Sequence, residues 1–200
     1  MFAGMALAVL WSGCGSVARA PEESLILVQG PTHWLMLPDE EQRARHLHGV
    51  PETLAFEESF WKRRDPDPAT PGNELLQEFN QRVDAADRLY QEGVVRGSLT
   101  DRGRALVILG APPILRYSQR QVPTWQPGHP GGEPNVETRT VQVETWVYLV
   151  DELPPPLAEA FRREGYEGEL EISFTALPDR TTITSGEKFL ELTVRATAHE

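Results

Sequence analysis

A periodic stripe of apolar residues between residues 71 and 92 constrains this chain more than any other feature. The apolar positions recur every three or four residues, which places them along one face of a helix. They are Leu75, Leu76, Phe79, Val83, Ala86, Leu89 and Tyr90. Thr70 and Pro71 provide a helix start, and Gly93 provides a stop. The pattern predicts a long amphipathic helix of about 30 Å that must bury one face against the rest of the chain.

Helices dominate the first part of the chain and strands the second. We expect helices to begin near Pro38 and Pro51, the second of them ending at the Asp-Pro-Asp-Pro turn of residues 65–68, because proline cannot continue a helix. The uniformly apolar run from Ala105 to Leu109 predicts a buried central strand. Further strands are predicted over 114–118, 136–150, 170–174 and 190–194, with a short helix from Pro154 to Arg163 between them.

This order predicts an α+β fold in which N-terminal helices pack on a mostly antiparallel sheet of about five strands. A length of 200 residues suits a single globular domain with a substantial core. The stretch from Gln119 to Asn135 is rich in proline and glycine, so we expect an exposed loop there. Trp125, Pro127 and Pro130 could present this loop to a partner as an extended segment with a tryptophan anchor.

The N-terminus has the features of an export signal. Met1 to Trp11 is an apolar run too short to cross a bilayer, which takes roughly 20 residues, but of suitable length for a signal peptide. Small residues precede Cys14, the only cysteine, and the arrangement resembles a bacterial lipobox, in which the cysteine is lipidated. Cleavage after Ala20 for plain secretion, or a buried helix with a free core cysteine, are the alternatives.

We therefore expect residues 1–13 to be a signal peptide, 14–32 a tether and 33–200 one domain. The expected location is the cell envelope, with a lipid anchor in a membrane and the domain facing the periplasm or the exterior; soluble secretion is the alternative. The net charge of −11 argues against nucleic acid as a partner, because phosphate contacts need clustered Lys and Arg. A single cysteine allows neither a disulfide framework nor a two-cysteine metal site.

A set of polar residues near the expected helix boundaries forms the candidate site. They are Arg64, Asp65, Arg82, Thr100, Asp101, Arg102 and Arg104. The arginines could clamp an anionic ligand, because a guanidinium group binds carboxylates in a bidentate manner. Alternatively, the set is an internal network of ion pairs and hydrogen bonds that locks the turns around the long helix. We assign no catalytic residue, no metal site and no cofactor.

Several short motifs carry a family resemblance. Phe60-Trp61-x-x-Arg64-Asp65-Pro66, Thr70-Pro71-x-Asn73-Glu74, Arg82, and Thr100-Asp101-Arg102-Gly103-Arg104 leading to Gly110-x-Pro112 resemble the GWxTD domain, a bacterial envelope-associated domain of unknown function. The resemblance covers roughly residues 34–113, with 144–148 as an outlying piece. Ser98 stands where the name-giving tryptophan of the family would be. The resemblance implies secretion or lipid anchoring and carries no known activity.

Three classes of function follow from these observations. The first is a non-enzymatic envelope lipoprotein whose sheet edge or proline-rich loop binds another envelope protein. A hydrolase or metal-dependent enzyme that uses the region of Asp65 and Asp101 is the second, and a purely structural accessory subunit is the third. We favour the first, because the sequence offers no pairing of a nucleophile with a base, no cluster of metal ligands and no cofactor loop. The sequence does not indicate an oligomeric state.

Overall fold

The computed structural model describes residues 22–126 and 135–198 of the chain. The helices are α1 (Glu22–Gln29), η1 (Pro31–Leu35), α2 (Pro38–Ala44), α3 (Gly49–Arg63), α4 (Glu74–Leu89), η2 (Gly97–Leu99), α5 (Asp101–Leu109), η3 (Val150–Glu152), α6 (Pro155–Arg163) and α7 (Glu187–Thr197). The strands are β1 (Ile114–Gln126), β2 (Asn135–Leu149), β3 (Glu169–Ala176) and β4 (Thr181–Ser185), which form an antiparallel sheet in the order β1-β2-β3-β4. The expected α+β fold is confirmed, but the sheet has four strands where about five were expected.

The long amphipathic helix is present as α4, although it is shorter at both ends than the expected 71–92. Its N-cap is Asn73, whose side-chain oxygen accepts a hydrogen bond from the Leu76 N–H at 2.8 Å. Phe79, Val83 and Ala86 are buried, as their spacing predicts. The proposed cap, Thr70, lies outside the helix and donates from its hydroxyl to Glu74.

The predicted central strand at Ala105–Leu109 is wrong, because these residues form the second half of α5. The hydroxyl of Thr100 caps this helix by accepting from the Gly103 N–H at 3.2 Å. Residues 105–108 are all buried, so the helix presents no polar face in this part. An apolar run without periodicity fits a buried helix as well as a buried strand. The strand predicted over 114–118 is part of β1, which pairs with β2.

Two further segments differ from expectation. Residues 190–194 lie in α7 and form no strand, and the fourth strand is the threonine-rich β4, which shows no apolar alternation. Part of the expected tether is folded: residues 22–29 form α1, in which Leu27 is buried, and η1 begins at Pro31. Residues 1–21, which include the expected signal peptide and Cys14, lie outside the described residues.

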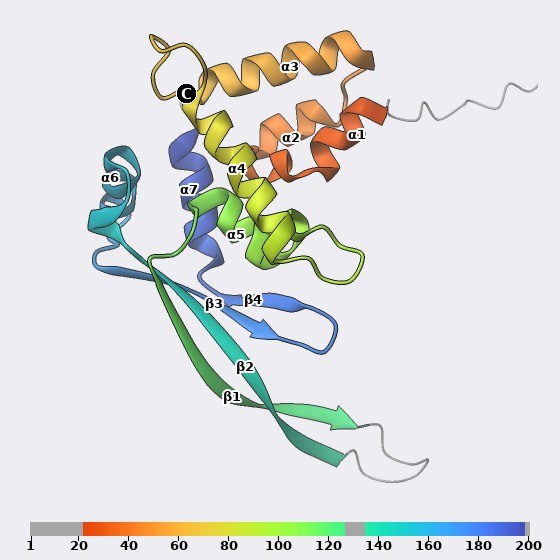
Figure 1. Ribbon diagram of the computed structural model, residues 1–200, viewed down its shortest axis with the longest axis vertical. Coiled ribbons are helices and arrows are strands. Elements are labelled where there is room, and N and C mark those ends of the chain that lie inside the picture. Colours follow the sequence, from red (N-terminus) through yellow and green to blue (C-terminus); the bar gives the residue numbers. More distant parts are fainter. Residues whose placement is uncertain (1–21, 127–134, 199–200) are drawn as a thin grey trace, which may run out of the picture.

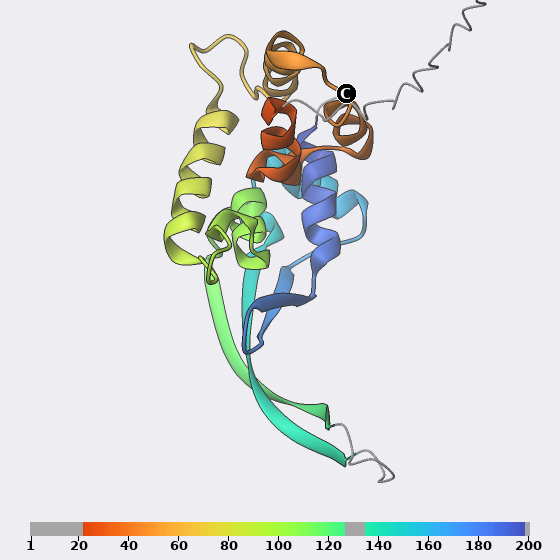
Figure 2. The same ribbon diagram turned by 90° about the vertical axis from the view of Figure 1, so that its right-hand side faces the viewer.

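The most distinctive feature of the fold is a two-stranded ribbon that projects from the body (Figures 1 and 2). β1 and β2 pair from Ile114↔Val147 to Gln126↔Asn135, but β3 pairs with β2 only from Val143 to Leu149. Residues 119–126 and 135–142 therefore pair with each other alone, and we call them the arm. The expected loop over 119–135 is wrong for the part that the structure describes, since Trp125 lies in β1. Pro127 and Pro130 lie outside the described residues.

Candidate functional site

Helix α5 carries three of the predicted site residues at its N-terminus. Asp101 accepts hydrogen bonds on Oδ2 from the Ile183 N–H at 2.7 Å and from the Thr182 hydroxyl at 3.1 Å. Arg102 forms ion pairs with Glu144 of β2 at 3.4 Å and with Glu92 at 3.6 Å. Both residues therefore attach the start of α5 to the sheet, Asp101 to β4 and Arg102 to β2.

Arg104 of α5 and Ser98 of η2 both contact Trp34. Arg104 pairs with Glu187 of α7 at 2.6 Å, and its guanidinium group lies 5.0 Å from the ring centroid of Trp34. The Trp34 indole N–H donates to the Ser98 carbonyl at 2.9 Å. Ser98 itself is fully buried. Ser98, which stands where the resemblance would place a tryptophan, is thus an interior residue contacted by a tryptophan from η1.

A second cluster holds the end of α3 to α2. The Arg64 side chain is fully buried and donates to both carboxylate oxygens of Glu40, at 2.9 and 2.5 Å, and to the Leu35 carbonyl at 2.8 Å. Burial alone would raise the pKa of Glu40, but hydrogen bonds from Arg64, from the Leu37 N–H and from Arg63 lower that pKa to about 2. No sequence pattern singles out Glu40, because it is one of three acidic residues in the first turn of α2.

Asp65 and Asp101, the two candidate carboxylates of an enzyme, lie in different surroundings. Asp65 follows α3 and accepts on Oδ1 from the Asp67 N–H at 3.2 Å, which stabilises the turn before α4. Asp101 accepts hydrogen bonds from β4. Within residues 22–126 and 135–198, no group of three or more His, Cys, Asp or Glu side chains is arranged to hold a metal ion.

The seventh predicted residue, Arg82 of α4, contacts the end of α5. Its guanidinium group donates to the Ile108 carbonyl at 3.2 Å and pairs with Glu78 at 2.8 Å. Cations are favourable at the C-terminus of a helix, where carbonyl groups lack intrahelical partners. Nearby, the buried Tyr148 hydroxyl donates to the Gly110 carbonyl at 2.8 Å. Arg82 and Tyr148 thus fix the point at which α5 ends and the chain turns toward β1.

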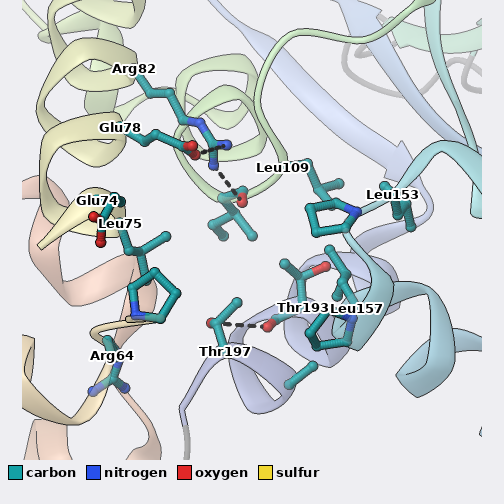
Figure 3. Close-up of a pocket in the computed structure, with 15 residues that line it drawn as sticks. Arg64, Glu74, Leu75, Glu78, Arg82, Leu109, Leu153, Leu157, Thr193 and Thr197 are labelled. Atoms are coloured by element: carbon teal, nitrogen blue, oxygen red, sulfur yellow. Dashed lines mark hydrogen bonds and ion pairs between the residues drawn. The ribbon is translucent and has the colours of Figure 1, made fainter. Parts of the chain in front are cut away.

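Arg64 and Arg82 also line a pocket of about 260 Å³ that no sequence pattern indicates (Figure 3). Its walls come from α4, the end of α5, the segment that leads into α6, and α7. The lining residues are Arg64, Pro66, Glu74, Leu75, Glu78, Arg82, Ile108, Leu109, Leu153, Pro154, Pro156, Leu157, Thr193, Ala196 and Thr197. Two of their buried atoms, Arg64 Nε and Glu74 Oε2, have no hydrogen-bond partner. Most of the lining residues are aliphatic or proline, so the pocket is largely apolar.

Comparisons with protein-family models, with curated proteins and with solved structures gave no match to this chain. Within the part of the chain that the structure describes, none of the helices has the length and apolar character needed to cross a membrane.

Proposed function

We propose that this protein is a non-enzymatic lipoprotein of the bacterial cell envelope that acts as a protein-binding or assembly module, with the arm as its binding element. The observation that carries the proposal is the isolation of the arm from the rest of the sheet. A two-stranded hairpin is only marginally stable alone in water, and its unpaired backbone groups are a template for another strand. An extended segment of an envelope protein could therefore add to the arm as a further strand.

One proline indicates how the backbone groups of the arm are directed. Pro123 is paired with Thr138 in the ladder and has no N–H to donate to β2. We infer that the two residues form a non-hydrogen-bonded pair, in which backbone polar groups point away from the partner strand. The pair Gln121↔Thr140 lies two residues away and has the same character. The Gln121 N–H then faces the free edge of β1, and the Thr140 N–H faces the free edge of β2.

The partners of the motif charges favour a binding module over an enzyme. Asp101, Arg102 and Arg104 bind β4, β2 and α7 respectively, so their bonding capacity is directed into the protein. Asp65 stabilises a turn on a different part of the chain. Among the described residues, Asp65 and Asp101 share no contact, which argues against an enzyme that uses them together. A purely structural accessory subunit remains the competing proposal, and the experiment below separates it from a binding module.

The proposed location depends on Cys14 and on the resemblance to the GWxTD domain. Seven residues, 15–21, lie between Cys14 and α1, and an extended chain from Cys14 to Glu22 reaches at most about 29 Å. A lipid on Cys14 would therefore hold the domain close to the membrane surface. We expect Cys14→Ala to release the protein from the membrane fraction; unchanged retention would refute lipid anchoring at this residue.

Proline substitutions on the two edges of the arm test the binding mode. Gln121→Pro removes an outward N–H from β1, and Thr140→Pro removes the matched N–H from β2 at the same cross-strand pair; both side chains are exposed. Each variant would be expressed as the full chain, cross-linked in intact envelopes and compared with the wild type. We expect a wild-type partner to be lost on one substitution and kept on the other. Retention of the same partners by both variants would exclude strand addition, and a wild-type protein without any partner would favour the accessory subunit.

A further inference from the structure

β1 forms one edge of the sheet, and the side chains beside this edge indicate what kind of strand could bind there. We propose that β1 receives an extended, acidic protein segment whose apolar residues contact Leu115 and Tyr117 and whose acidic residues lie on the side of Arg120. The inference rests on the proposed function, because it names the edge that binds and the chemistry of the bound segment.

The backbone of β1 is open along one side. β1 is the first strand in the order β1-β2-β3-β4, and its only backbone hydrogen-bonding partner among the described residues is β2. Its pairing with β2 keeps one register throughout, so the alternation inferred at Pro123 and Gln121 continues to Gln119, Tyr117 and Leu115. The N–H groups of the last four residues therefore face the free edge. Figures 1 and 2 show that this edge lies on the side of the sheet opposite to β4.

Two apolar side chains next to the free edge are uncovered. Leu115 pairs with Trp146 and Tyr117 pairs with Glu144, so both lie on the sheet face that packs against the helices. Trp146 is fully buried and contacts Tyr90 at the end of α4, whereas Leu115 is 48% exposed and Tyr117 is 70% exposed. The helical layer thus ends at β2. An added strand could cover both side chains, and cross-strand pairs of aromatic and β-branched residues are stabilising.

The charged side chains next to the free edge are two arginines on the opposite face of the sheet. Arg116 pairs with Glu169 at 2.8 Å and with Glu171 at 2.6 Å, so its charge is offset by β3. Arg120 is exposed and forms no ion pair within residues 22–126 and 135–198. An acidic side chain on an added strand would provide that partner, whereas a lysine there would be repelled. Because Tyr117 and Arg120 lie on opposite faces, the apolar and acidic residues of the bound segment should alternate.

Short alternating peptides test this inference, because alternation gives the same two faces to a parallel and to an antiparallel strand. The probes are an octapeptide that alternates valine and glutamate, its valine–lysine counterpart, and a peptide of four valines followed by four glutamates. Each would be titrated into the full-length protein at about 0.15 M salt, where a Debye length of about 8 Å leaves mainly local charges effective. We expect the valine–glutamate peptide to bind about tenfold more tightly than the other two.

Hydrogen exchange locates the bound peptide on one edge. Saturation with the valine–glutamate peptide should slow the exchange of the Leu115, Tyr117, Gln119 and Gln121 amides by about tenfold. The Thr140 amide, which faces the free edge of β2, should exchange at its original rate. Protection of the Thr140 amide instead, or of none of these amides, would overturn the proposal.

Three variants separate the apolar contact from the charge. Tyr117→Ser should weaken binding of both alternating peptides by about fivefold and leave the preference for glutamate intact. Arg120→Gln should remove most of that preference. Arg163→Gln is the matched control, since it removes an exposed arginine of α6, and it should leave the preference unchanged. Equal binding of the two alternating peptides by the wild type, or an unchanged preference in Arg120→Gln, would refute an acidic partner.

These outcomes can be told apart from a failure of the proposed function. If the peptides protect the β1 amides without a preference for glutamate, strand addition stands and only the acidic partner is refuted. If no peptide protects them, the inference fails, and the proline variants Gln121→Pro and Thr140→Pro then decide whether strand addition fails with it. Protection of the same amides in concentrated protein without peptide would identify a second copy of the chain as the occupant and would also overturn the inference.

Discussion

The region around α5 and the arm differ in where their polar groups find partners. Around α5, charged side chains from one short helix reach β2, β4 and α7, and almost every such group has an internal partner. In the arm, the two strands pair only with each other, and one backbone edge of each strand faces away from its partner. The motif residues of this chain therefore bond within the body of the protein, whereas the arm, which we propose as the binding element, lies outside the motifs.

The two regions also differ in how they depend on buried contacts. Trp146 and Phe174 lie in the sheet beneath the helices, are fully buried and have ring centroids 5.0 Å apart. In the arm, Gln121, Pro123, Thr138 and Thr140 are exposed, and Val141 next to the body is buried. Substitutions near α5 should therefore change the free energy of unfolding strongly, and substitutions in the arm should hardly change it.

The largest effect is expected for Gly103→Ala. A Cβ atom at Gly103 would lie 1.7 Å from the Gly97 carbonyl oxygen, so α5 and η2 could not keep their present separation. We expect a loss of about 4 kcal/mol or more in the free energy of unfolding, measured by denaturant titration. Gly93→Ala is the control, because Gly93 has a φ of 56° but open space around it, and strain alone should cost about 1 kcal/mol. Equal losses in the two variants would show that the contact between α5 and η2 is not tight.

Glu40→Gln tests the buried ion pair and its pH dependence. Removing the charge leaves the buried Arg64 guanidinium group uncompensated, which should cost about 3 kcal/mol at pH 7. Because the folded pKa of about 2 lies below the ordinary value of 4.5, the stabilisation by Glu40 is complete above about pH 4.5 and is lost as the pH falls toward 2. Thermal melts of the variant should therefore vary less with pH in this window. Glu41→Gln, at a partly exposed ion pair, should cost less than about 1 kcal/mol.

Asp101→Ala should destabilise the protein by about 1–3 kcal/mol, because the Ile183 N–H loses its acceptor. Asp101→Asn keeps an acceptor oxygen and should cost less. Asp65→Ala removes only the 3.2 Å hydrogen bond to the Asp67 N–H, and we expect a loss below about 1 kcal/mol. A melting temperature of Asp101→Ala equal to that of the wild type would contradict the structural role of Asp101 and renew the case for a site there.

Local patterns predicted those parts of this fold in which one face of an element is polar. The stripe of α4 and the alternation of β3 have such faces, and both elements were predicted correctly. Residues 105–109 are almost all buried, so their composition could not distinguish a helix from a strand. At residues 190–194, the alternation of Leu190, Leu192 and Val194 indicated a strand, although the segment lies in α7. β4 is held by pairing with β3 and by Asp101, and neither contact is visible in its own sequence.

The candidate site was less predictable than the fold, because its contacts join residues far apart in the chain. The motif arginines were identified, but their partners Glu40, Glu144 and Glu187 were not, since each is one of 30 acidic residues. The pocket combines residues from Arg64 to Thr197, and only tertiary packing brings them together. The β1 half of the arm, residues 119–126, was mistaken for a loop because polar residues and proline occur both in loops and in exposed edge strands.

The smallest effect on stability is expected from shortening the arm. Deleting residues 121–140 and joining Arg120 to Val141 through Asn-Gly leaves a hairpin closed by an existing cross-strand pair, in a turn type that two-residue hairpin loops favour. Residues 121–123 and 138–140 are mostly exposed and pair only with each other, so the melting temperature should stay within about 2 °C of the wild-type value. The same variant should lose the envelope partners proposed to bind the arm. A shortened protein that melts far below the wild type would show that the arm supports the body, and the contrast between the two regions would then fail.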